Sequence, residues 1–218
     1  FKQKTAYEML RSLVGSEMCI RDRLIMVYPI SYPTPDIHTT FKSYPAAVQP
    51  ISRGLRVNVI IHNDNVLYKN KLGEDISGWE MYDEQFMNLA QGQSTVFDGH
   101  AMEVNGIEIV ETDNKKVLEA DAENIRFVFW DVIRYDGFRN GEDTRIGYNW
   151  RYNGLEHMIL LAMDKNTSPC YDAVKADLVG SDEQLELTVQ KYQSKCVIKS
   201  LDSTWKHGID PSQIICDI

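Results

Sequence analysis

Alternating apolar and polar positions predict β-strands early in the chain. Residues 46–51 form a short apolar run, and residues 55–61 are rich in Val and Ile, with Arg56 and Asn58 alternating against them. Residues 62–65 (HNDN) have the composition of a turn, and apolar positions return in residues 66–69. This pattern predicts one strand followed by a β-hairpin.

Helical periodicity replaces this alternation in three later segments. Apolar side chains recur at steps of three and four residues in 82–90, 148–162 and 182–192. Ser181 and Gln184 have the spacing of a capping box, which predicts where the third helix begins.

Further β segments lie between and after these helices. Residues 94–97 precede an Asp98-Gly99 turn, and Asn105-Gly106 joins two short apolar runs in a second predicted hairpin. Residues 125–133 read as a buried central strand, and residues 196–199 as a last strand before a loop at Trp205. Strands and helices mix without a βαβ rhythm, so we predict an α+β fold with antiparallel sheets.

Composition narrows the class of protein. The chain has 218 residues, 43% of them hydrophobic, which is enough for one domain with a substantial core. It has no uninterrupted apolar run of about eighteen residues, which argues against a membrane-spanning helix. The four cysteines show neither Cys-x-x-Cys pairs nor zinc spacing, so we expect free thiols and a reducing, cytoplasmic setting.

The first 23 residues are expected not to be native. The string FKQKTAYEMLRSLVGSEMCIRDR is similar to the translation of a sequencing adapter joined to a transposon-end primer, although Lys4 to Leu13 would also suit an amphipathic helix. Without its five basic and three acidic residues, the rest carries 18 basic and 29 acidic residues, a net charge of −11. A nucleic-acid contact would therefore need a local basic patch. Residues 24–45 are expected to be a proline-rich lead-in and 46–218 the domain.

Common catalytic motifs are absent from the sequence. There is no Gly-x-x-x-x-Gly-Lys loop, Gly-x-Gly-x-x-Gly, His-Glu-x-x-His or Gly-x-Ser-x-Gly, and the five His have no metal-ligand spacing. An ordered series of short motifs is present instead, at residues 49–56 (QPISRGLR), 70–73 (NKLG), 97–100 (FDGH), 127–131 (FVFWD), 148–151 (YNWR) and 196–205 (CVIKSLDSTW). In order and spacing, this series resembles the adenylation (nucleotidyltransferase) domain of the ATP-dependent DNA ligases, most closely the phage type.

The resemblance implies a fold, a ligand and a site. Two antiparallel sheets with flanking helices would surround a cleft for ATP and Mg²⁺, in a bacterial or phage-infected cytoplasm. The residues implied to bind the nucleotide are Gln49, Gly54, Arg56, Asp98, Trp130 and Lys199, with the Trp130 ring stacked on adenine. Lys71 and Arg151 would contact nicked DNA. The family continues into an oligonucleotide-binding barrel, which we expect to be absent after Ile218.

Several positions depart from the family pattern where its chemistry lies. The departures are Ile51 for the attacking lysine, Arg53 for an aspartate, His100 for a glutamate, Ser194-Lys195 for a Glu-Gly pair, and Cys216 and Ile218 for two lysines. Isoleucine has no lone pair that could bond to phosphorus. We therefore predict a ligase-like domain that folds but cannot self-adenylate, with no catalytic residue and no metal ligand, and that retains binding of a nucleotide or another partner.

Two alternatives stay open on the sequence alone. One is a working DNA ligase, acting in replication or repair, whose sequence is corrupted or truncated; re-sequencing that gives Lys at position 51 would revive it. The other is a structural α+β interaction domain whose motif matches arose by chance. In that case Trp130 is ordinary core, and Arg151 and Lys199 are ordinary charged residues.

Overall fold

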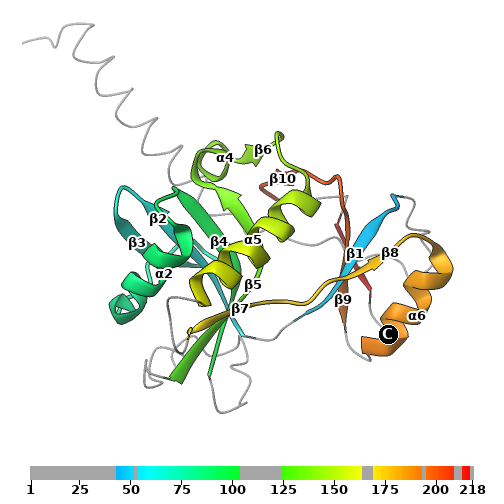
Figure 1. Ribbon diagram of the computed structural model, residues 1–218, viewed down its shortest axis with the longest axis horizontal. Helices are drawn as coiled ribbons and strands as arrows, with labels where there is room; N and C mark the ends of the chain where they lie inside the picture. Colours follow the sequence, from blue (N-terminus) through cyan, green and yellow to red (C-terminus); the bar gives the residue numbers. More distant parts are fainter. Residues whose placement is uncertain are drawn as a thin grey trace, which may run out of the picture.

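The computed structural model describes residues 43–51, 54–103, 124–163, 169–192, 195–208 and 213–216. The predicted segments at residues 1–42 and the Asn105-Gly106 hairpin turn lie outside these ranges. Two sheets organise the described residues, and Figure 1 shows them at opposite ends of the molecule, with α5 (Tyr148–Met163) running between them. None of the helices in the described ranges is long and apolar enough to cross a membrane.

The larger sheet has five strands in the order β3-β2-β4-β5-β7. These strands are β2 (Leu55–His62), β3 (Asn65–Asn70), β4 (Thr95–Glu103), β5 (Ile125–Arg134) and β7 (Tyr171–Ala173). The predicted β2–β3 hairpin is confirmed, and Asn63 and Asp64 at its tip both have positive φ, as a two-residue hairpin turn requires. All pairs are antiparallel except β5 with β7, which are parallel because the chain returns through α5 before β7.

One face of this sheet carries the main hydrophobic core. Helix α2 (Asp83–Ala90), preceded by the short helix η1 (Glu80–Tyr82), places Phe86 and Leu89 against Phe127 and Phe129 of β5. Helix α5 packs Leu155 and Ile159 into the same cluster. The helical periodicity of residues 82–90 and 148–162 is therefore confirmed, since both helices bury their apolar stripe here.

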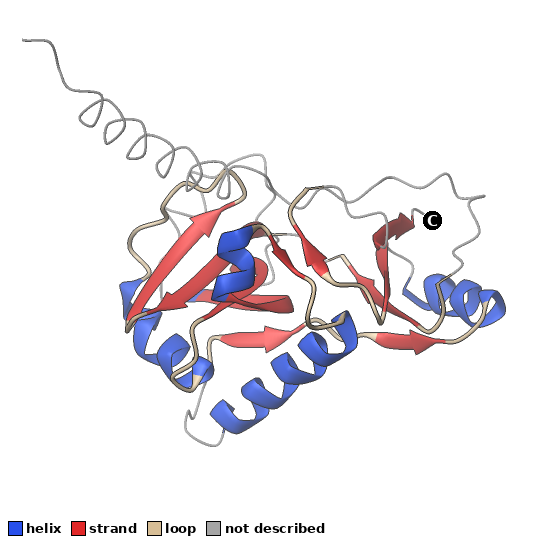
Figure 2. Ribbon diagram, turned by 90° about the horizontal axis from the view of Figure 1, so that it is seen from above, coloured by secondary structure: helices blue, strands red, loops and turns tan. Residues whose placement is uncertain are grey.

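The smaller sheet has four antiparallel strands in the order β11-β9-β1-β8. They are β1 (Ala46–Pro50), β8 (Asp177–Val179), β9 (Cys196–Ser200) and β11 (Gln213–Cys216). Helix α6 (Asp182–Tyr192) covers one face, through Leu185 and Val189 packed near Val48 and Ile198. The amide of Gln184 donates to Ser181 Oγ at 3.3 Å, so the predicted cap of this helix is confirmed. Figure 2 shows α6 beyond this sheet, on the side away from the larger one.

The α+β fold is confirmed, with three corrections to the predicted elements. Asp98-Gly99 is not a turn, because both residues lie inside β4 at a register shift opposite β5. The sheets are not wholly antiparallel, as the β5–β7 pair shows. The segment after Trp205 is not only a loop: β10 (Trp205–Lys206) pairs with β6 (Glu142–Asp143), and β11 follows. Helix α4 (Tyr135–Asn140), which continues directly from β5, was also missed.

Candidate functional site

The candidate site lies between the two sheets, where buried charges gather from both. Arg56 comes from β2, Asp98 from β4, Asp131 from β5, Arg151 from α5 and Lys199 from β9, and all five are buried. Charges are rarely buried in such numbers without pairing or function. Their arrangement therefore decides what this region can bind.

Arg56 and Asp98 form the first ion pair. Arg56 Nε donates to Asp98 Oδ1 at 3.2 Å and its Nη2 donates to Oδ2 at 2.8 Å, a two-point contact between neighbouring strands. Asn58 Nδ2 also donates to Asp98 Oδ1, at 3.0 Å. Three hydrogen bonds thus hold a carboxylate that the resemblance assigns to nucleotide binding.

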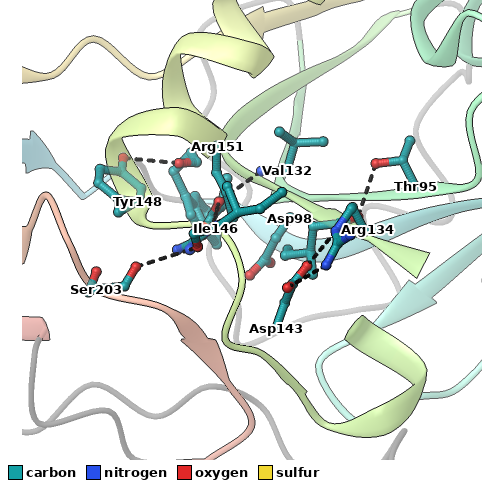
Figure 3. A network of polar contacts seen from close by, with 12 residues as sticks. Thr95, Asp98, Val132, Arg134, Asp143, Ile146, Tyr148, Arg151 and Ser203 are labelled. Atoms are coloured by element: carbon teal, nitrogen blue, oxygen red, sulfur yellow. Dashed lines mark hydrogen bonds and ion pairs between the residues drawn. The ribbon is translucent and has the colours of Figure 1, made fainter. Parts of the chain in front are cut away.

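Arg151 and Asp131 form the second ion pair, and Figure 3 shows the surroundings of Arg151 in close view. Arg151 Nε and Nη2 donate to the two carboxylate oxygens at 2.8 and 3.1 Å. Its Nη1 donates to the carbonyls of Ile146 and Ser203, so α5 is tied to the segment after β9. Burial works against the charged guanidinium, but the Asp131 carboxylate outweighs it and holds the pKa of Arg151 above its ordinary value. With its side chain 2% exposed, Arg151 favours a structural role over the expected contact with DNA.

Lys199 is the third buried cation, and it has no such partner. Its side chain is 2% exposed, its Nζ lies 4.5 Å from the centre of the Tyr148 ring, and no described carboxylate comes within ion-pair distance. Burial lowers the pKa of Lys199 to about 8, although the nearby Asp131 charge opposes this shift. Three cations share the region with two carboxylates, which leaves one positive charge uncompensated among the described side chains. Such a surplus favours an anionic ligand.

Trp130 lies beside the first ion pair. The guanidinium of Arg56 lies over its ring at 5.4 Å from the ring centre, and the His100 ring meets it edge-on at 4.7 Å. Trp130 has no cross-strand partner in β4, because Asp98 pairs with Asp131 and Gly99 with Phe129. This bulge places an aromatic side chain beside the ion pair of Arg56 and Asp98.

Gln49 contributes a polar group from the smaller sheet. Its side chain is 2% exposed and its Nε2 donates to the carbonyl of Val174 at 3.3 Å. Its Oε1 is buried and accepts no hydrogen bond from the described residues. An unpaired buried acceptor is energetically unfavourable, about 1–3 kcal/mol, unless a ligand or water donates to it.

Glycine is needed at two positions of the predicted motifs, because a neighbouring strand comes too close there for any Cβ atom. A Cβ on Gly54 would lie 2.7 Å from the carbonyl oxygen of Ala101, and one on Gly99 would lie 2.3 Å from that of Val128. Gly54 therefore acts through packing of β2 on β4 in this structure, and Gly99 allows the bulge that presents Trp130.

The structure brings together most, but not all, of the predicted site residues. Gln49, Arg56, Asp98, Trp130 and Lys199 come from strands of the two sheets. Lys71 instead begins the turn after β3, next to Asn70, which pairs with Val57. Asp131 and Tyr148 were missed. The signal for Asp131 was a single carboxylate inside an otherwise apolar strand, and Tyr148 lies one helical turn before Arg151.

The described residues do not fit a resident metal ion. They contain no group of three or more His, Cys, Asp or Glu side chains suited to hold one. Asp98 and Asp131 already accept hydrogen bonds from arginines on both oxygens.

Comparison with known proteins supports the fold. No family model matches the chain, and no curated protein sequence matches it. Its structure is similar to that of the ATP-dependent DNA ligase of bacteriophage T7 in complex with ATP, with a TM-score of 0.69, 13% identity, and coverage of 89% of this chain and 69% of that one. It is also similar to the ligase domain of Mycobacterium tuberculosis LigD (TM-score 0.60, 15% identity, 88% and 59% covered). A third match is the Chlorella virus DNA ligase-adenylate (TM-score 0.56, 12% identity, 88% and 69% covered).

These likenesses concern the fold of part of each ligase. The chain spans about half to two thirds of the length of the ligase structures that it matches. The matched structures cover nearly nine tenths of this chain. The chain therefore has the fold of the nucleotidyltransferase domains of ATP-dependent DNA ligases.

Proposed function

We propose that this chain is a ligase-like nucleotidyltransferase domain that binds ATP between its two sheets and is not adenylated at position 51. Adenine would lie against Trp130 and Gln49, and the phosphates would approach Lys199. Position 51, at the end of β1, carries a hydrocarbon side chain that cannot attack phosphorus.

The uncompensated buried charge of Lys199 is the observation that carries this proposal. A buried ammonium without a carboxylate partner is unfavourable unless something anionic joins it. The unpaired Oε1 of Gln49 points to a hydrogen-bond donor in the same ligand. Because Nε2 of Gln49 is held by the Val174 carbonyl, the side chain presents an acceptor, which matches an exocyclic amino group such as that of adenine. Two of the matched ligase structures were determined with ATP bound.

Sealing of nicked DNA does not form part of the proposal. Arg151, one of the two predicted DNA contacts, is buried and donates four hydrogen bonds inside the fold. A net charge of −9 over the full sequence also disfavours a phosphate backbone.

Calorimetric titration of the full chain with ATP and Mg²⁺ tests the proposal, with GTP as the competing ligand. We expect ATP to bind and GTP to bind more weakly, because guanine presents a carbonyl rather than an amino group toward Gln49. Lys199→Met should weaken ATP binding about tenfold or more, since a charged hydrogen bond contributes about 1.5–3 kcal/mol.

The matched control is Lys191→Met. Lys191 lies on α6, is exposed, and pairs with Asp177 on the outer side of the smaller sheet. Its loss should leave the affinity for ATP unchanged. If ATP does not bind to the unmodified chain, the interaction-domain alternative replaces this proposal, and the ion pairs between the sheets are then purely structural.

A further inference from the structure

Strand β1 presents alternate residues to the two sides of the smaller sheet. Ala46 and Val48 pack under α6, whereas Ala47 packs against Tyr148 and Gln49 reaches Val174 on the inner side. The side-chain period of a strand is two residues. Position 51 therefore continues the inner series, which places it on the side that faces the larger sheet.

The pairing of β1 with β9 runs one step beyond the ends of both strands. The amide of Ile51 donates to the carbonyl of Lys195 at 2.9 Å. This bond continues the register in which Ala47 faces Lys199 and Gln49 faces Val197. Ile51 and Lys195 are therefore direct cross-strand neighbours.

Directly opposed residues in an antiparallel pair carry their side chains on the same face, with Cβ atoms about 4.5–5.5 Å apart. Lys195 thus begins on the same face as Ile51, Val197 and Lys199. Its side chain is solvent-exposed, in contrast to the enclosed Lys199. A lysine ammonium on a flexible four-carbon stem can reach the space next to its neighbour's Cβ.

We propose that Lys195 supplies the amine that position 51 lacks and becomes covalently adenylated. The inference rests on the proposed binding of ATP between the sheets. In this step the lone pair of deprotonated Lys195 Nζ forms a bond to the α-phosphorus of ATP. The bond from that phosphorus to the bridging oxygen of the β-phosphate breaks, and pyrophosphate leaves with the electron pair. The remaining extra proton on Nζ passes to solvent, which leaves a neutral phosphoramidate nitrogen.

Lys195 suits this step better than Lys199 does. An attacking amine must lose a proton and then approach phosphorus in line with the leaving group. Lys199 is held over the Tyr148 ring and enclosed by Arg56, Arg151 and their carboxylates, so it can attract a phosphate but has little freedom to move onto it. Lys195 lies at the strand end, beside the position from which the resemblance expects the attack.

The test is incubation of the full chain with ATP labelled on the α-phosphate and Mg²⁺, followed by denaturation at neutral pH and peptide mapping. A phosphoramidate is stable at neutral pH and is released by acid, so acid treatment identifies the bond. We expect label on the peptide that contains Lys195, with pyrophosphate released in equal amount. Lys195→Ala and Lys195→Arg should both reduce the label to background, and Lys191→Ala should leave it unchanged.

Calorimetry with ATP measures nucleotide binding separately from adenylation of Lys195. Lys195→Arg keeps a cation for the phosphates, so it should still bind ATP while taking no label. ATP binding to the unmodified chain without label, or label that survives in Lys195→Arg, would overturn the Lys195 proposal and leave the proposed function standing. Absence of ATP binding would overturn both.

A variant that moves the amine back across the strand pair provides a further control. Ile51→Lys combined with Lys195→Ala should be labelled at position 51, because the two side chains start side by side on one face. If this double variant is labelled while the unmodified chain is not, the phosphate lies where we place it and Lys195 fails to reach it, which refutes the proposal.

Discussion

Replacing Lys199 with methionine should make the protein more stable. Met has a similar length and fits an apolar environment, whereas the lysine ammonium is fully enclosed between the sheets. The four charges around Lys199 already form two ion pairs, Arg56 with Asp98 and Arg151 with Asp131. Removal of the lysine therefore leaves balanced pairs rather than an unpaired carboxylate.

The expected gain in the free energy of unfolding follows from the pKa of the buried Lys199 amine. Burial lowers the pKa of Lys199 from 10.5 to about 8. A lowering of this size means that the charged form destabilises the folded state by about 3 kcal/mol relative to the neutral form. At about pH 7 the lysine is charged in both states, so the full penalty applies, and Lys199→Met should raise the free energy of unfolding by about 3 kcal/mol.

The stability difference between Lys199→Met and the unmodified protein should depend on pH in a characteristic way. Between about pH 8 and 10.5 the unfolded chain keeps the proton that the folded chain has lost, so the stability of the unmodified protein gains from Lys199 as pH rises. The advantage of Lys199→Met should therefore be constant below about pH 8 and shrink toward zero near pH 10.5.

Urea unfolding followed by tryptophan fluorescence measures this difference at each pH. Comparing variant with unmodified protein at the same pH cancels the titration of the other groups that they share. Lys191→Met, at an exposed site, should change stability by less than about 0.5 kcal/mol and show no such trend. An advantage of Lys199→Met that does not change with pH, or a variant that is less stable at neutral pH, would refute the reasoning.

Two further predictions concern the same region. Arg151→Met should destabilise the fold by about 3–5 kcal/mol, because Asp131 would remain buried without its partner. In a double-mutant cycle with Asp131→Asn, the double variant should lose less free energy of unfolding than the two single variants together. Strictly additive losses would contradict the pairing. Gly99→Ala should destabilise by at least about 1–3 kcal/mol through the collision of its Cβ with the Val128 carbonyl. Gly154→Ala, in α5 with open space around the new Cβ, should instead stabilise by about 0.4–1 kcal/mol, and equal effects of the two alanines on the melting temperature would refute the packing argument.

Long elements with a clear period were predictable from the sequence. The apolar stripe of residues 148–162 and the continuous apolar run of residues 125–133 both gave the observed helix and strand, because each buries a large surface in one core. Short elements were not predictable. Strands β6 and β10 have two residues each, and they form because Asp143 and Trp205 meet across a large sequence separation. No local pattern of two residues carries that information.

The candidate site was predictable as a set of residues but not as a set of contacts. The order of the motifs placed Arg56, Asp98, Trp130 and Lys199 in one region, and the structure brings them together. The helical period places position 151 on the same face as Tyr148, but the sequence could not show that Arg151 meets Asp131 there, since that partner lies on a different element. Asp98-Gly99 was predicted as a turn because that dipeptide usually is one, whereas here tertiary pairing requires it inside a strand, at a bulge.

The residues that match the ligase pattern and those that depart from it differ in what they touch. Gly54 and Gly99 are retained where any Cβ would strike a neighbouring carbonyl, and Arg56, Asp98, Asp131 and Arg151 satisfy one another inside the fold. These positions are needed for folding whether or not a ligand binds. By the register of β1 with β9, position 51 continues the face of the smaller sheet that is turned toward the larger one, and its hydrocarbon side chain brings no polar group there. Lys199 is the exception, since it is buried, unpaired by any described carboxylate and destabilising, yet present. A charge of this kind is expected to persist only where something anionic repeatedly joins it, which makes it the strongest reason to look for a bound nucleotide.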